Sequence, residues 1–365
     1  NLKTHRNSLL EPLQAIAGIV ERRHTLPILS NVLIEHEANR IAFTATDLEM
    51  QMRAVSSVGP LGSGAVTVSA RKLLDILRSF SEDQDVGLEA KDSRVIVKAG
   101  KSRFSLQLLP AQDFPKMASA EDVGQTIEVP QSALRNLLAK THFAMAQQDI
   151  RYYLNGLLFA LSGDTLRVVA TDGHRLSLAT HALEQPAEAR EAIVPRKAVA
   201  ELVKLLGTGD QPVKMTFKTN QVKFEFGDVE LTSKLIDGKF PDYLKVVPVN
   251  YAKHLQVDRV QWQQALQRAA ILSNDKVRGV RLTLTTDNLA MSCTNNEQEE
   301  AQEDMAVAYA HEPLDIGFNL TYLLDVLNHV QVDEIVCSLG DSGSSALITV
   351  PGDDSFKYVV MPMRI

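Results

Sequence analysis

The chain has few of the residues that build disulfide frameworks or metal sites. Its 365 residues include two cysteines, Cys293 and Cys337, which excludes a disulfide framework and a cysteine-based zinc site. We expect both to be small buried side chains in a reducing cytoplasm. The nine histidines show no metal-ligand spacing, so we expect no metal and no other cofactor.

The signatures of membrane proteins and of several enzyme classes are also missing. No apolar run approaches the roughly 18 residues of a membrane span, and no secretory leader is visible, so we expect no membrane association. The sequence has no GxGxxG after a strand, no GxxxxGK(S/T), and no HExxH, GxSxG or CxxC motif. Hydrophobic residues make up 45% and charged residues 23%, which indicates a folded globular protein rather than a disordered one.

What the sequence does contain is a repeated unit of one short strand, one amphipathic helix and about three further strands. Alternating apolar and polar residues, as in 31–36, 41–46 and 50–56, predict the strands. Pro12 lies inside the first helical pattern, so that helix either starts later than Arg6 or is kinked. The predicted helices, which start about 60 to 65 residues apart, are 6–23, 71–79, 131–142, 196–206, 259–272 and 320–329.

A second repeat has twice this length. The tripeptide at 45–47, Ala-Thr-Asp, recurs at 170–172 and more weakly, as Cys-Thr-Asn, at 293–295. The units therefore come in pairs, and each pair predicts an α+β domain in which two helices cover one face of antiparallel sheet. The predicted domains are 1–124, 125–251 and 252–365.

Positive charge is concentrated on the predicted helices. They carry 13 Lys and Arg against 5 Asp and Glu, whereas the chain as a whole has a net charge of −7. The net charge alone argues against a nucleic-acid-binding protein. However, Glu forms helices as well as Lys does, so its scarcity on these helices favours a polyanionic partner over ordinary solvated helix faces.

The segment around Asp172 and His174 is the best candidate for catalysis. On a strand the two side chains share a face and could form a base and its orienting carboxylate. However, Asp172 repeats Asp47 and Asn295, where no histidine follows at the same offset, which favours a turn in which the side chain bonds its own backbone. Two alternatives to a protein that binds nucleic acid remain. One is an enzyme that uses this pair, and the other is a repeat scaffold that never touches DNA.

Several segments along the whole chain resemble the bacterial DNA sliding clamp, the β subunit of the DNA polymerase III holoenzyme. They are TLPIL (25–29), ATDLEM (45–50), SRFSL (102–106), QDIRYYLNG (148–156), ATDGHRL (170–176), IVPRK (193–197), FPDY (240–243), AAILSN (269–274) and YVVMPMRI (358–365).

The resemblance implies the DNA clamp fold, with three similar domains in each chain and a head-to-tail homodimer that closes into a ring. It implies a non-catalytic processivity factor whose helices face duplex DNA. The contacts between the helices and DNA are expected to be independent of base sequence, weak and sensitive to salt. The implied partners are the replicative polymerase subunit, the clamp loader and other proteins with clamp-binding motifs.

The resemblance carries three sets of residues onto this chain. The first set contacts DNA; the alternatives are core packing for its tyrosines and ordinary solvation for its charges. These residues are Arg23, Arg71, Lys72, Gln148, Tyr152, Tyr153, Arg196 and Lys197.

The second set forms a hydrophobic pocket for partner peptides, where Leu, Val and Met make an adaptable apolar groove. The alternative is a buried core strand that ends in 361–363. The pocket residues are Leu154, Thr171, Gly173, His174, Arg175, Leu176, Pro241, Val246, Asn319, Tyr322, Ser345, Val359, Met361, Pro362 and Met363.

The third set forms the dimer interface, where apolar residues meet across the subunit boundary and basic residues face an acidic run. The alternatives are burial of the apolar residues within one chain and a solvated acidic edge. These residues are Lys72, Arg103, Phe104, Leu106, Ile271, Leu272, Glu297, Glu299, Glu300 and Glu303.

Three positions depart from the family pattern. Lys245 replaces an arginine beside the pocket, which puts a bidentate contact in doubt. Gly343 replaces a larger apolar residue, so the pocket wall is expected to be shallower there. His24 replaces a proline, so the DNA-contacting loop is expected to be less rigid.

Overall fold

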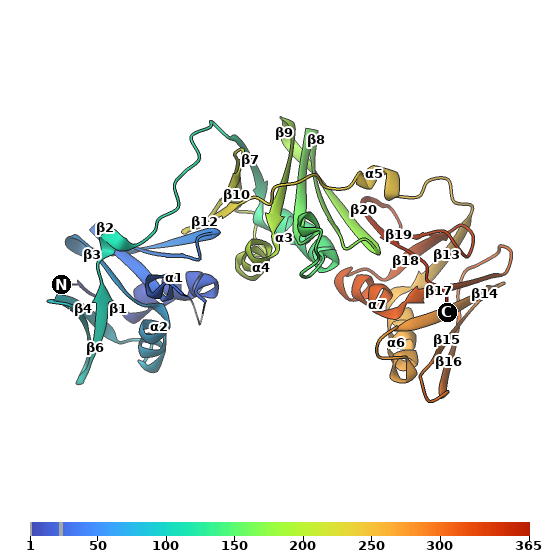
Figure 1. Cartoon of the computed structure of the whole chain (residues 1–365), viewed down its shortest axis with the longest axis horizontal. Coiled ribbons are helices and arrows are strands. Elements are labelled where there is room, and N and C mark those ends of the chain that lie inside the picture. The colour runs from blue at the N-terminus through green and yellow to red at the C-terminus, as the bar shows by residue number, and fades with distance from the viewer. Residues whose placement is uncertain (1, 22–24) are drawn as a thin grey trace. The chain divides into compact units, whose positions relative to one another are not determined.

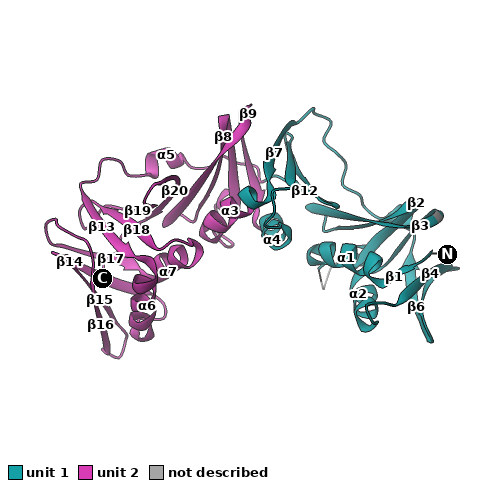
Figure 2. Cartoon of the chain, turned by 180° about the vertical axis from the view of Figure 1, so that it is seen from behind, with its two compact units in different colours: residues 1–134, 197–235 teal, residues 135–196, 236–365 magenta. Residues whose placement is uncertain are grey.

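The computed structural model describes residues 2–21 and 25–365 (Figure 1). The chain forms two compact units, which are shown in different colours in Figure 2. Unit 1 contains residues 1–134 and 197–235, and unit 2 contains residues 135–196 and 236–365. Within the part that the structure describes, no helix is long and apolar enough to cross a membrane.

All six predicted helices are confirmed. They are α1 Arg6–Ile16, α2 Ala70–Ser79, α3 Gln131–Thr141, α4 Arg196–Leu205, α6 Arg259–Ala269 and α7 Leu320–His329. A short helix that the sequence pattern did not predict, α5, spans Tyr243–Val246. The 3-10 turns are η1 Ala17–Ile19, η2 Pro27–Ser30, η3 Ala111–Asp113, η4 His142–Ala144, η5 Tyr152–Leu154 and η6 Ala270–Leu272.

Polar side chains fix where several of these helices begin. Asp258 accepts a hydrogen bond from the backbone N–H of Gln261 (2.8 Å) at the start of α6, and Asn319 caps α7 in the same way. Of the two alternatives for the first helix, the late start is wrong, because α1 begins at Arg6 with Pro12 buried inside it. The predicted extent to residue 23 is also wrong, since α1 ends at Ile16 and passes into η1.

Unit 1 contains one antiparallel sheet in the order β1-β4-β5-β6-β3-β12-β11-β10-β7, with β2 paired to β3. The strands are β1 Leu2–His5, β2 Asn31–Thr46, β3 Met50–Ser69, β4 Asp85–Lys91, β5 Arg94–Ala99, β6 Ser102–Leu109, β7 Gln125–Pro130, β10 Pro212–Phe217, β11 Gln221–Phe226 and β12 Val229–Lys234. The predicted strands 31–36 and 41–46 form the single strand β2, whose register shifts around Ala38.

Unit 2 contains a six-stranded sheet, β13-β18-β19-β20-β9-β8, and a four-stranded sheet, β16-β15-β14-β17. The strands are β8 Gly156–Thr171, β9 Arg175–Pro195, β13 Lys253–Asp258, β14 Gly279–Thr285, β15 Asn288–Thr294, β16 Glu300–Ala306, β17 Leu314–Asn319, β18 Glu334–Leu339, β19 Ala346–Val350 and β20 Asp353–Val360.

Each unit contains a strand pair that crosses a predicted domain boundary. In unit 1, β12 pairs with β3, with Ser233 opposite Met50. In unit 2, β20 pairs with β9, with Val360 opposite Arg175. Main-chain hydrogen bonds therefore connect parts of the chain that lie more than a hundred residues apart.

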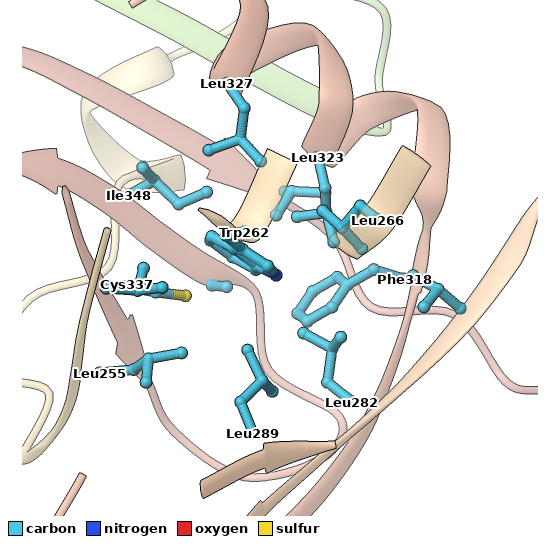
Figure 3. Packing of buried hydrophobic residues seen from close by; sticks show 14 of the residues in the cluster. Leu255, Trp262, Leu266, Leu282, Leu289, Phe318, Leu323, Leu327, Cys337 and Ile348 are labelled. Atoms are coloured by element: carbon cyan, nitrogen blue, oxygen red, sulfur yellow. The ribbon is translucent and has the colours of Figure 1, made fainter. Parts of the chain in front are cut away.

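The core of the C-terminal part lies between α6, α7 and the two sheets of unit 2 (Figure 3). Trp262 and Leu266 of α6 point inward and meet Phe318 of β17 and Leu282 of β14. Cys337 is buried in the same cluster, and desolvation raises the pKa of its thiol to about 12.

Replacing Leu266 with Ala is expected to lower the free energy of unfolding of this part by about 2–5 kcal/mol, because a cavity remains in a packed core. Val260 lies on the same helix but is 40% exposed, so Val260→Ala should cost less than about 0.5 kcal/mol. Urea unfolding followed by tryptophan fluorescence would measure both changes, since the chain has one tryptophan, Trp262. Equal losses in the two variants would contradict this description of the core.

Candidate functional site

Each of the three repeated Asp or Asn residues accepts hydrogen bonds from the backbone that follows it, which confirms the turn interpretation. Asp172 Oδ1 accepts hydrogen bonds from the backbone N–H groups of His174 (2.9 Å) and Arg175 (3.1 Å). Asp47 accepts from the N–H groups at the same two offsets, whereas Asn295 accepts from Glu297 (2.9 Å) and from Glu299 (3.0 Å), four residues further on. Gly173, within the second of these turns, has a φ of 88°, which glycine adopts without strain.

The sheet beside this turn has a different neighbour on each face. Ser177 of β9 donates a hydrogen bond to the carbonyl of Lys140 on α3, and Tyr358 of β20 donates one to the carbonyl of Tyr322 on α7. The adjacent residues Leu176 and Val359 pack in the apolar cluster of α5 and its preceding segment. Because successive side chains alternate across a strand, α5 lies on the face opposite α3 and α7.

A cavity of about 270 Å³ lies on the face that carries α5. It brings together ten of the residues that the resemblance assigned to the pocket. These are Leu154, Thr171, Gly173, His174, Arg175, Leu176, Pro241, Val246, Val359 and Met361. Their apolar side chains come from strands, a 3-10 turn, α5 and the chain terminus, so the cavity depends on the β9–β20 pairing.

The charge of Arg175 is directed into the protein. Its guanidinium donates hydrogen bonds to Asp172 Oδ2 (3.2 Å), to Asp325 on α7 and to the carbonyl of Phe143 (2.9 Å). It also lies 4.6 Å from the ring centroid of Tyr322, which in turn stacks on His174. Two carboxylates neutralise Arg175, so this residue fixes the geometry of the cavity rather than offering it a free charge.

The other five predicted pocket residues do not line the cavity. Asn319 caps α7, and the ring of Tyr322 stacks on that of His174. The carbonyl of Ser345 accepts a hydrogen bond from Tyr251. Pro362 and Met363 are half-buried in the chain terminus beyond Met361.

The cavity has two lining residues that the sequence analysis did not assign to it, Arg151 and Tyr153. Arg151 pairs with Asp149 (2.9 Å), and this hydrogen bond lowers the pKa of Asp149 to about 2. The sequence signal that could have indicated Arg151 as a lining residue is the Asp-x-Arg spacing at 149–151, close to the predicted pocket residue Leu154.

The predicted DNA contacts differ in how free their charges are. Arg71 and Lys72 are exposed in the first turn of α2, where Arg71 Nε lies 3.9 Å from the exposed Asp75 Oδ2 of the same helix. Lys197 Nζ instead lies 2.5 Å from Asp47 Oδ2 and 3.2 Å from Glu21 Oε1. Burial disfavours its charge, but these carboxylates raise the pKa of Lys197 above its usual value, so its charge is held within unit 1.

The other predicted DNA contacts among the described residues lie around the loop that follows η4. Arg196 donates to the carbonyls of Met145 (3.3 Å) and Ala146 (3.5 Å), and is thus partly committed within unit 2. Tyr152 is 59% exposed, which removes the core-packing alternative for this ring, whereas Tyr153 is half-buried. Gln148 has a φ of 54° in the loop between η4 and η5. Arg23 and His24 lie outside the described residues.

The predicted apolar dimer contacts also divide into two groups. Ile271 is 77% exposed and Phe104 is 37% exposed, as unpaired interface residues would be. Leu272 is half-buried, and Leu106 is already buried within unit 1.

The acidic run next to Ile271 is largely exposed along β16 and the turn before it. Glu303 is bound by Arg268 of the same chain at 2.9 and 2.7 Å, and Glu299 accepts from Asn295 (2.6 Å). Glu297, Glu300 and Arg103 are exposed. The Arg268–Glu303 pair was missed because the two residues lie 35 positions apart.

The DNA polymerase III beta subunit family matches the chain in three consecutive parts. Its N-terminal domain matches residues 1–118, its central domain 128–242 and its C-terminal domain 244–364. The beta sliding clamps of Vibrio cholerae serotype O1 and Escherichia coli K12 are each 45% identical to the chain, over 361 and 363 residues. Both alignments cover 99% of this chain and 98% of the relative.

Solved clamp structures agree with the fold over the whole chain. The Pseudomonas aeruginosa sliding clamp bound to griselimycin has a TM-score of 0.97 at 44% identity, covering 100% of this chain and 99% of that one. The Caulobacter crescentus pol III beta structure has a TM-score of 0.93 at 39% identity, covering 100% of both chains. The chain therefore belongs to the DNA polymerase III beta subunit family, the beta sliding clamps, and is a non-catalytic processivity factor of a DNA polymerase, with the three-domain clamp fold.

Proposed function

We propose that the three tasks of a sliding clamp, which are enclosing DNA, closing the ring and binding partners, fall to three separate surfaces of this chain. The observation that carries this proposal is the six-stranded sheet of unit 2, whose two faces are covered by different elements. Helices α3 and α7 lie on one face, and α5 and the cavity lie on the other. We assign the domains to 1–124, 125–251 and 252–365, and we place the protein in the cytoplasm, where it meets chromosomal DNA.

The helical face would enclose the duplex. Exposed Arg71 and Lys72 of α2, and Gln148 and Tyr152 of the loop after η4, support this assignment. Lys197 and Arg196 would contribute less than their charges suggest, because they already have partners in the chain. Contacts with phosphates alone are weak and carry no base information, which suits a ring that must slide.

Loading on nicked circular DNA tests enclosure. A closed ring cannot leave a circle, so we expect the clamp to stay on the circle through gel filtration and to slide off once the circle is cut. Binding that relied on phosphate contacts would be lost equally from both DNAs as salt is raised. Equal loss from the intact and the cut circle would contradict topological enclosure.

The ring would close between the part of β6 that precedes Leu108 and an edge strand of a second copy. Strand β6 pairs along its length with β5 but meets β3 only at Leu108 and Leu109, and β16 is the last strand of its sheet. Pairing these edges would satisfy their backbone groups. It would also bring Phe104 toward Ile271, and Arg103 toward Glu300.

Ile271→Asp is expected to shift the particle from about 80 kDa, twice the chain mass of 40.2 kDa, toward the monomer, because it places a charge in an apolar contact. Sedimentation equilibrium would measure the mass. Ile150→Asp is the matched control, since Ile150 is 95% exposed outside the proposed interface. A dimer that is unchanged by Ile271→Asp would reject this interface.

The cavity beside Met361 would receive apolar side chains of partner segments. Its lining is mainly apolar, with His174 held by stacking on Tyr322. Griselimycin, which the P. aeruginosa clamp binds, is a suitable probe for this cavity. Two of the positions that depart from the family pattern have partners within the chain: Lys245 pairs with Asp242 (3.0 Å), and the N–H of Gly343 donates to Asp341 Oδ1 (2.9 Å).

His174→Ala is expected to weaken griselimycin binding by about tenfold, since a desolvated contact worth about 1.4 kcal/mol is lost. The dimer should keep its mass. Fluorescence anisotropy with labelled griselimycin would measure the affinity, with His36→Ala in unit 1 as the control. Unchanged affinity in His174→Ala would place the binding site elsewhere.

A further inference from the structure

The last five residues, 361–365, run from the cavity to the edge of the four-stranded sheet. After β20 ends, the N–H of Met361 donates to the carbonyl of His174 (2.9 Å). Two residues later the N–H of Met363 donates to the carbonyl of Gly317 (2.9 Å), on the outermost strand β17. The terminus is therefore held at two points, one at Met361, which lines the cavity, and one two residues after it.

Two glycines form the surface on which the terminus ends. Gly279 of β14 lies opposite Asn319, two residues along β17 from Gly317, so both glycines are on one face of the sheet. This face is opposite the one that buries Ile316 and Phe318. The side chain of Ile365 lies across both glycines. Glycine inside a strand often marks the close approach of another backbone.

The two glycines are not equally tolerant of a side chain. A Cβ atom at Gly317 would lie 2.6 Å from the backbone oxygen of Met363 and 2.6 Å from Ile365 Cδ1. The three atoms nearest to a Cβ atom at Gly279 all belong to the side chain of Ile365, at 3.3 to 3.7 Å. Rotation of Ile365 can relieve the contact at Gly279, but nothing short of moving the terminus can relieve the one at Gly317.

We propose that Gly317 is a positioning residue for the partner cavity: by admitting the backbone of Met363 and the side chain of Ile365, it holds the terminus so that Met361 forms the cavity wall. The inference rests on the proposed binding of partners in that cavity. Met361 is 50% exposed, so packing around its side chain does little to fix it. Its position is set instead by the hydrogen bonds of its own backbone and of Met363.

Gly317→Ala and Gly279→Ala test the proposal as a matched pair, because both place a methyl group on the same face of neighbouring strands. We expect Gly317→Ala to speed amide exchange at Met361 and Met363 and to weaken griselimycin binding by about tenfold. Gly279→Ala should leave both close to wild type. Ile365→Ala, which removes the other half of the contact without touching the sheet, should speed exchange at Met363 and weaken binding in the same direction.

The outcomes separate this inference from the proposal on which it rests. Failure of the wild-type clamp to bind griselimycin would overturn the cavity assignment itself. Wild-type binding with equal affinity in Gly317→Ala and Gly279→Ala would overturn the positioning role alone, even if exchange at Met363 rises. A folded dimer with slow exchange at Met361 in all variants would also overturn it.

Discussion

Main-chain pairing across the domain junctions is the interaction on which the rest of the structure depends. Where β20 meets β9, the register places Val360 opposite Arg175, so the chain terminus follows directly onto the turn at Asp172. The cavity, the stacking of His174 on Tyr322 and the seating of the terminus all follow from that register. A shift of β20 by one residue would turn Val359 toward the helices and remove part of the apolar lining.

The same design is used at the other junction with different side chains. Ser233 of β12 lies opposite Met50 of β3, and the N–H of Lys234 donates to the carbonyl of Glu49, just as Met361 donates to His174. There, however, Lys234 Nζ forms an ion pair with Glu49 (3.1 Å) where the second junction has an apolar methionine beside a histidine. Related backbones thus carry an ion pair at one junction and a cavity at the other.

Local patterns predicted the helices and the turns, because amphipathic spacing and Asx turns depend on residues close in sequence. The partners of the charged residues could not be predicted in this way. Lys197 looks like a free cation at the start of α4, yet it is held by Asp47, 150 positions away. Arg268 likewise looks available on α6, but Glu303 of β16 binds it. The charge count of the helices therefore overstated what is free to meet DNA.

The burial of both thiols has a practical consequence. Cys293 and Cys337 are almost wholly enclosed, and desolvation raises the pKa of each, so little reactive thiolate forms near neutral pH. A cysteine introduced at an exposed position would then be the dominant target for maleimide dyes or bifunctional crosslinkers. Fluorophore pairs or covalent staples could be installed on the otherwise natural sequence, without first removing its own sulfur groups.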